Sequence, residues 1–103
     1  MADLSQKEWA EQLRADENAV ILDVRTPAEF QQGFIPDASN IDIYRGQQFM
    51  AELEKLDKSK SYYVYCRSGV RSRQACALMN GLGIEKAYNL EGGIIAWQGE
   101  VVR

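Results

Sequence analysis

The sequence predicts an α/β fold in which a small, open, mostly parallel sheet is flanked by helices on both faces. Short apolar runs alternate along the chain with segments whose apolar residues recur at helical spacing. The clearest of these runs is continuously apolar, as a parallel strand is when both of its faces are buried. Because 103 residues have room for one ordinary core, residues 1–103 are expected to form a single domain.

Two capping boxes in the first third of the chain each predict the start of a helix. The first occupies residues 5–8, and the amphipathic segment that follows is expected to end before Asp16. The second occupies residues 26–29 and has proline at the first helical position. A short helix is therefore expected there that stops by Gly33.

Four segments are predicted to be strands. Residues 19–22 form a continuous apolar run that ends at Asp23, which is typical of an interior strand. Alternation of apolar and polar side chains predicts a short strand over residues 40–44. Residues 62–65 are rich in strand formers, and residues 87–90 are expected to form the last strand.

Two further helices follow from apolar spacing. The first contains Phe49, Leu53 and Leu56. The apolar face of the second is made by Ala75, Leu78, Met79 and Leu82. Because this second helix closely follows the strand at residues 62–65, residues 66–72 are predicted to be a loop that joins a strand to a helix.

Charge and composition exclude several classes of function. The formal charge of −3 and the pI near 4.9 give no general attraction for nucleic acid or an anionic membrane, so neither is an expected partner. No targeting pattern or membrane-spanning run is visible, so we expect a cytoplasmic protein. With Cys66 and Cys76 as its two cysteines and no histidine, the chain is expected to have no disulfide framework, no metal site and no cofactor.

The absence of histidine also limits how a nucleophile can be activated. No Ser-His-Asp or Cys-His pair can form, so an activated thiol must owe its reactivity to a lowered pKa. Cys66 follows a predicted strand, at the edge of a parallel sheet where ligands bind, and the next helix adds positive potential at its N-terminus. Arg67, Arg71 and Arg73 add three formal positive charges to the same stretch. We therefore expect Cys66 to be a nucleophilic thiolate.

Three motifs, in order along the chain, resemble the family of single-domain rhodaneses, which are thiosulfate sulfurtransferases. The loop at 66–72 is similar to the active-site loop of the family, residues 22–30 and 33–38 to its upstream motif, and residues 90–97 to its C-terminal motif. The resemblance implies a rhodanese-like fold and a double displacement. In that reaction Cys66 takes the outer sulfur of thiosulfate or a persulfide, and the resulting persulfide passes it to a thiophilic acceptor. The acceptor is cyanide or a thiol, including a protein thiol.

Within this resemblance Cys66 is the catalytic residue, and the rest of its loop binds the substrate. The substrate-binding residues are Arg67, Ser68, Gly69, Val70, Arg71 and Ser72. The loop N–H groups are expected to cradle the persulfide, while Arg67 and Arg71 hold the anionic end of the donor, with Arg71 favoured. Ser68 and Ser72 have hydroxyls that could donate to sulfur or cap the helix, and capping is the preferred role for Ser72.

Two other functions fit parts of the sequence. A cysteine-dependent phosphatase or arsenate reductase also uses a thiolate loop, but its arginine lies six positions after the cysteine. This chain has Ser72 at that position, and its arginine comes one position earlier, at Arg71. The shorter loop suits sulfur better than phosphate. The other alternative is a non-catalytic rhodanese-like interaction or sulfur-delivery module, and the retained Cys66 argues against a non-catalytic role.

Five residues outside the loop carry narrower expectations. Cys76 falls inside the predicted helix and is expected to be a small core residue. Asp23 and Arg25 end a neighbouring strand, where they either shape the site or form a structural pair or helix cap. Phe34 stands where the family often has histidine, and Asp37 where it often has glycine, so the resemblance leaves the geometry of the turn near them open.

Overall fold

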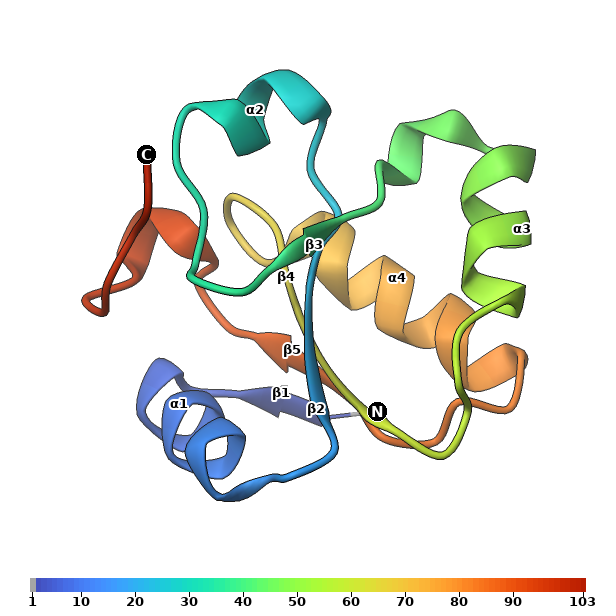
Figure 1. Ribbon diagram of the computed structural model, residues 1–103, viewed down its shortest axis with the longest axis horizontal. Coiled ribbons are helices and arrows are strands. Elements are labelled where there is room, and N and C mark those ends of the chain that lie inside the picture. Colours follow the sequence, from blue (N-terminus) through green and yellow to red (C-terminus); the bar gives the residue numbers. More distant parts are fainter. Residues whose placement is uncertain (1) are drawn as a thin grey trace.

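Five parallel strands form one sheet at the centre of the molecule in the computed structural model, which describes residues 2–103. The strand order is β1-β5-β4-β2-β3, and each neighbouring pair is parallel (Figure 1). In chain order the elements are β1 (Ala2–Leu4), α1 (Gln6–Ala15), β2 (Ala19–Asp23), α2 (Pro27–Gln31), β3 (Ser39–Asn40), the 3-10 helix η1 (Ile43–Arg45), α3 (Gln47–Glu54), β4 (Ser61–Tyr65), α4 (Val70–Gly81), β5 (Ala87–Leu90) and the 3-10 helix η2 (Ile94–Ala96). The predicted α/β class is confirmed.

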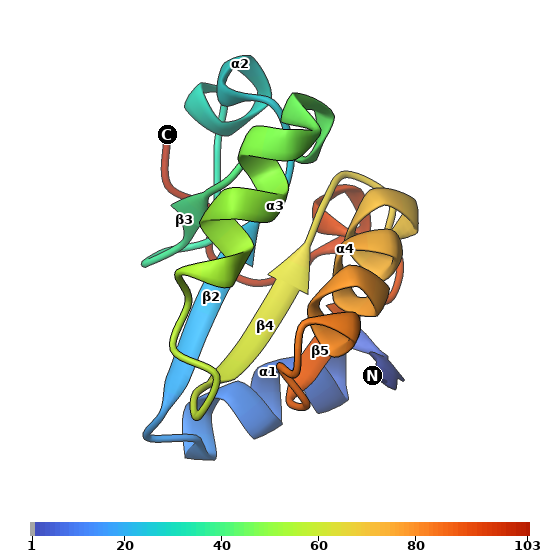
Figure 2. The same ribbon diagram turned by 90° about the vertical axis from the view of Figure 1, so that its right-hand side faces the viewer.

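Helices cover both faces of the sheet, as predicted. α1 packs on one face, and α3 and α4 pack on the other (Figures 1 and 2). The side chains of β4 alternate between the two cores: Tyr62 and Val64 face α3 and α4, whereas Tyr63 and Tyr65 face α1. All residues of β4 are buried, so the strand that leads to Cys66 is held from both sides.

The two capping boxes start helices where the sequence predicts them. In α1 the Ser5 hydroxyl accepts a hydrogen bond from the Glu8 backbone N–H, and the Glu8 carboxylate accepts one from the Ser5 backbone N–H. Thr26 and Glu29 make the same reciprocal pair at α2, which begins at Pro27. These contacts satisfy donors that a helix start leaves free. None of the helices within residues 2–103 is long and apolar enough to cross a membrane.

The strand predicted over residues 40–44 is wrong in its extent. β3 contains only Ser39 and Asn40, after which the chain turns into η1. The cause is Asp42, whose carboxylate accepts a hydrogen bond from the Tyr44 backbone N–H at 2.9 Å and so stabilises a turn. The sequence does not predict β1, because its three residues contain no run of strand formers, and this strand depends on pairing with β5.

Asp37 lies in the turn whose geometry the family resemblance leaves open. Its backbone has a φ of +70°, and among residues 2–103 it is the one non-glycine residue with a positive φ. Aspartate enters this left-handed region more readily than most residues, but its Cβ still makes the conformation unfavourable. Asp37 therefore adopts a backbone conformation that suits glycine better.

Replacing Asp37 with glycine is expected to raise the free energy of unfolding by about 0.5–1 kcal/mol, because glycine adopts this φ without strain at Cβ. Urea unfolding followed by circular dichroism measures the change. Asp37→Ala is the control, since alanine keeps the Cβ and loses the polar side chain, and it should destabilise the protein. A glycine variant no more stable than the alanine variant would contradict the role assigned to the backbone here.

Candidate active site

The carboxyl ends of β2 and β4 meet at one edge of the sheet, and Cys66 lies directly beyond β4. The two strands are paired in parallel register, with Asp23 opposite Tyr65. α4 begins at Val70, so the cysteine loop joins a buried strand to the N-terminus of a helix, as predicted. Cys66 has no exposed surface. Its sulfur therefore faces the dipoles of the protein in place of bulk water.

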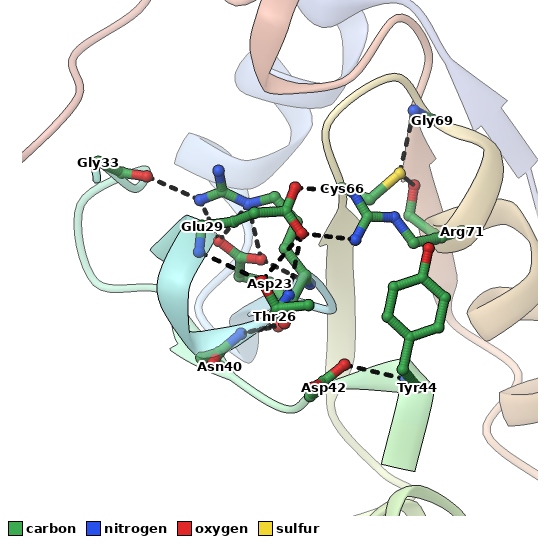
Figure 3. A network of polar contacts seen from close by, with 12 residues as sticks. Asp23, Thr26, Glu29, Gly33, Asn40, Asp42, Tyr44, Cys66, Gly69 and Arg71 are labelled. Atoms are coloured by element: carbon green, nitrogen blue, oxygen red, sulfur yellow. Dashed lines mark hydrogen bonds and ion pairs between the residues drawn. The ribbon is translucent and has the colours of Figure 1, made fainter. Parts of the chain in front are cut away.

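Hydrogen-bond donors of the loop point at the Cys66 sulfur. The Gly69 backbone N–H donates to Sγ at 3.1 Å (Figure 3). The Ser72 hydroxyl lies 3.3 Å from Sγ. Burial opposes ionisation of the thiol. The Ser72 hydroxyl and the backbone N–H groups of three loop residues outweigh burial and hold the pKa of Cys66 below its usual value. Fixed dipoles thus activate the thiol where no histidine base exists.

The C-terminal motif that follows β5 supports the cysteine loop from behind. The Ile94 N–H donates to the Cys66 carbonyl at 2.9 Å, and the Ile95 N–H donates to the Arg67 carbonyl at 3.1 Å. Gly93 packs so closely that a Cβ built on it would lie 2.2 Å from the Arg67 carbonyl oxygen. Because no side chain fits in that space, glycine is required for the loop to follow this path.

The predicted capping role of Ser72 is wrong. Gly69 is the N-cap of α4, with a φ of +101°, and no side chain caps this helix. Ser72 lies three residues further along, where its hydroxyl reaches Cys66 and the side-chain oxygen of Asn89. A hydroxyl has one proton, so Ser72 donates to one of these two acceptors at a time. The Ser68 side chain is exposed and makes no hydrogen bond within residues 2–103.

Asn89 is a residue of the site that the sequence analysis does not identify. It is buried in β5, and its side-chain amide donates to the Gly69 carbonyl at 3.1 Å and to the Asp3 carboxylate at 2.8 Å. Its oxygen is the second acceptor within reach of the Ser72 hydroxyl. Asn89 therefore ties the cysteine loop and α4 to the sheet. The sequence contains one indication of this role: Asn89 lies inside a predicted strand, where asparagine is uncommon.

Of the three arginines that follow Cys66, two have acidic partners. Both terminal nitrogens of Arg71 contact the Glu29 carboxylate, at 2.7 and 2.9 Å. Arg73 contacts Asp3 at 3.2 Å. Arg67 is exposed and makes no ion pair within residues 2–103. The positive charge predicted for the loop is thus compensated at two of three positions by acids from distant parts of the chain.

Asp23 and Arg25 form a buried ion pair, which confirms the structural alternative for these residues. Their closest atoms are 2.6 Å apart, and the Asp23 carboxylate also accepts from the Arg25 backbone N–H at 2.9 Å. The Arg25 guanidinium donates to the Gly33 carbonyl at 2.7 Å and lies 5.6 Å from the centre of the Tyr65 ring. The pair therefore fastens the end of β2 to the segment after α2, which forms one side of the site.

A hollow of about 360 Å³ opens beside the cysteine loop, between α2 and η2. It is lined by Arg25, Glu29, Gln32, Arg67, Ile94 and Ile95. Arg67 is the one lining residue whose charge is uncompensated, so the hollow suits a small anion. No three histidine, cysteine, aspartate or glutamate side chains are grouped to hold a metal ion in the described part of the chain.

Cys76 is a core residue, as predicted. It is fully buried in α4, among the residues that pack between the sheet and the helices α3 and α4. Burial raises the pKa of its thiol to about 12. A thiol with such a raised pKa is a weak nucleophile at neutral pH, which agrees with a packing role for Cys76.

The chain is similar to known proteins over almost its whole length. The family model for the rhodanese-like domain matches residues 6–100. A sulfurtransferase of Allochromatium vinosum is 39% identical over 95 residues, which cover 92% of this chain and 86% of that protein. The putative sulfurtransferase YtwF of Bacillus subtilis is 41% identical over 90 residues, covering 87% and 84%. The crystal structure of a rhodanese-like domain protein from Staphylococcus aureus matches with a TM-score of 0.82 at 33% identity, covering 97% of this chain and 94% of that one.

Replacing Ser72 with alanine is expected to raise the pKa of Cys66, because the hydroxyl that lies 3.3 Å from its sulfur is lost. Alkylation of Cys66 by iodoacetamide near neutral pH should slow roughly fivefold, which is the effect of one hydrogen bond. Alkylation rates over a range of pH, followed by mass spectrometry, measure the shift. Ser68→Ala is the matched control and should leave the profile unchanged. If both variants gave the same profile, the Ser72 hydroxyl would have no part in activation.

The ion pair between Glu29 and Arg71 should make stability depend on pH. Its hydrogen bonds lower the pKa of Glu29 to about 2 in the folded protein, below its ordinary value of 4.5. The pair therefore contributes fully above about pH 5, and its contribution of about 1–2 kcal/mol is lost as the pH falls toward about 2. Urea unfolding of the wild type and Glu29→Gln measures this. The difference in the free energy of unfolding between the wild type and Glu29→Gln should become smaller at acidic pH.

Glu8→Gln is the control for this measurement, since it changes the capping box of α1, where no arginine pairs with the glutamate within residues 2–103. Its stability relative to the wild type should vary less with pH. A Glu29→Gln difference that stayed constant across the acidic range would show that the ion pair does not stabilise the fold.

Proposed function

This chain belongs to the rhodanese-like domain family, and we propose that it moves a sulfane sulfur from thiosulfate or a persulfide donor to cyanide or a thiol. The observation that carries this proposal is the Cys66 sulfur itself. It is buried, its pKa is lowered, and it accepts hydrogen bonds from Gly69 and Ser72. A thiolate in such a cradle is both a nucleophile and a site where a second anionic sulfur can be stabilised.

In the first half-reaction the Cys66 thiolate attacks the outer sulfur of the donor. With thiosulfate, a bond forms between Sγ and that sulfur, the sulfur–sulfur bond of the donor breaks, and its electron pair leaves with sulfite. The product is a persulfide anion on Cys66, and the step needs no proton and no outside oxidant. The N–H groups of the loop, Gly69 among them, are the donors closest to this new anion.

In the second half-reaction the acceptor attacks the outer sulfur of the persulfide. Cyanide leaves as thiocyanate and restores the Cys66 thiolate. A thiolate acceptor, including one on a protein, becomes a persulfide in the same exchange, so atoms and charge balance for either acceptor. The relay thus needs one cysteine, which agrees with the buried and protonated state of Cys76.

The loop supports sulfur transfer over the two alternative functions. Ser72 occupies the position of the phosphatase arginine, and both terminal nitrogens of Arg71 are engaged with Glu29. A tetrahedral oxyanion would therefore lack the bidentate arginine that phosphate binding uses. The lowered pKa of Cys66 favours catalysis over a non-catalytic module.

The setting we propose is a reducing one. Cys66 and Cys76 are both free thiols, and free thiols persist in the cytoplasm, where thiol acceptors are also available. We therefore place the reaction in the cytoplasm, with residues 1–103 acting as one domain.

Purified protein given thiosulfate and cyanide should form thiocyanate, and Cys66→Ser should abolish this activity, because a hydroxyl cannot carry the sulfur. Thiocyanate is measured by its coloured iron complex, and a gain of one sulfur atom on Cys66 is measured by intact mass and peptide mapping after thiosulfate alone. Cys76→Ser is the control and should remain active. Thiocyanate formation by Cys66→Ser, or faster hydrolysis of an aryl phosphate than sulfur transfer, would overturn the proposal.

A further inference from the structure

Arg71 is held in a fixed position beside the cysteine loop. Its guanidinium makes the bidentate contact with Glu29, and Figure 3 shows it directed from α4 toward that carboxylate on α2. Glu29 is fixed in turn, because its Oε1 accepts from the Thr26 backbone N–H at 3.2 Å and from the Thr26 hydroxyl at 3.1 Å. The Tyr44 ring flanks the guanidinium with its centre 5.4 Å away. The positive charge of Arg71 is thus neutralised by the Glu29 carboxylate.

Arg67 is the cation that remains for an anionic donor. It lines the same hollow as Glu29, is exposed, and has no acidic partner within residues 2–103. The side chains of Arg71 and Glu29 are only 17% and 28% exposed, so water screens their charges incompletely. An anion that enters the hollow therefore meets one net positive charge, because Arg25 and Arg71, the other two arginines nearby, are each paired with an acid.

From this balance of charge we propose that Glu29 determines the donor class: by cancelling Arg71, it makes the site prefer monoanionic sulfane donors, such as organic persulfides and thiosulfonates, to dianionic thiosulfate. The proposal rests on the sulfurtransferase function proposed above. A donor with one negative charge is matched by Arg67. The second charge of thiosulfate has no free cation to meet it and lies near the Glu29 carboxylate.

Two donors of matched sulfur chemistry test this assignment. Thiosulfate is a dianion that leaves as sulfite, and methanethiosulfonate is a monoanion that leaves as methanesulfinate, with cyanide as the common acceptor. Glu29→Gln keeps a side chain that suits the capping box but removes the negative charge. In this variant kcat/KM for thiosulfate should rise roughly tenfold and that for methanethiosulfonate roughly threefold, because a freed charge acts twice on a dianion. The gain should appear in KM and diminish with added salt.

Three further variants separate charge from structure. Glu29→Asp keeps the charge with altered geometry, so its ratio of the two kcat/KM values should stay near that of the wild type. Arg71→Gln exposes the Glu29 carboxylate and should shift the ratio toward the monoanion. The double variant Glu29→Gln/Arg71→Gln removes a pair with no net charge, so it should restore the wild-type ratio. Glu8→Gln lies in the other capping box and should leave kcat/KM unchanged for both donors.

The outcomes distinguish this proposal from the one on which it rests. If the wild type used neither donor, the sulfurtransferase function and the role of Glu29 would both be wrong. If both donors were used but Glu29→Gln left their ratio unchanged, the role of Glu29 alone would be wrong. If the ratio of the two kcat/KM values shifted equally in Glu29→Asp and Glu29→Gln, the effect would come from altered structure. That result would also overturn the proposed role of the Glu29 charge. Should Glu29→Gln not fold, the direction of the shift in Arg71→Gln decides.

Discussion

A buried thiol that must ionise without a histidine partner is the constraint on which the rest of this site depends. Charge in a position without exposed surface must be stabilised by the protein itself. Here the stabilising groups are the N–H of Gly69, its neighbours in the loop, and the hydroxyl of Ser72. Backbone groups point at the sulfur only if the loop keeps its path, which Gly93 and the N–H of Ile94 impose from behind. The C-terminal motif is thus part of the site without touching sulfur.

The net charge of the site depends on ion pairs with acids from other elements more than on the number of arginines in the loop. Three arginines follow the cysteine within a few residues, yet α2 supplies Glu29 to one of them and β1 supplies Asp3 to another. Such pairing holds the loop in place and also limits the field that a donor meets. An anion that approaches the loop therefore meets one arginine, Arg67, that has no acidic partner within residues 2–103.

The fold could be predicted to the extent that it depends on local chemistry. The capping boxes at residues 5–8 and 26–29 start helices because their hydrogen bonds form within one turn. The strand predicted over residues 40–44 was limited to its first part by one side chain, that of Asp42, whose turn competes with pairing. The site followed the same rule. Cys66 could be located from a strand followed by a basic loop, whereas Asn89 acts through contacts that only the folded sheet creates.

The two cysteines show where reactivity comes from. Cys66 and Cys76 are both fully buried, and burial alone would raise the pKa of both thiols. Within residues 2–103, N–H groups are aimed at the sulfur of Cys66 and not at that of Cys76, and the two pKa values move in opposite directions. Reactivity therefore belongs to the backbone path around Cys66 more than to cysteine as a residue. Because side-chain changes cannot remove backbone dipoles directly, Gly93 and Asn89 act on the thiol by holding that path in place.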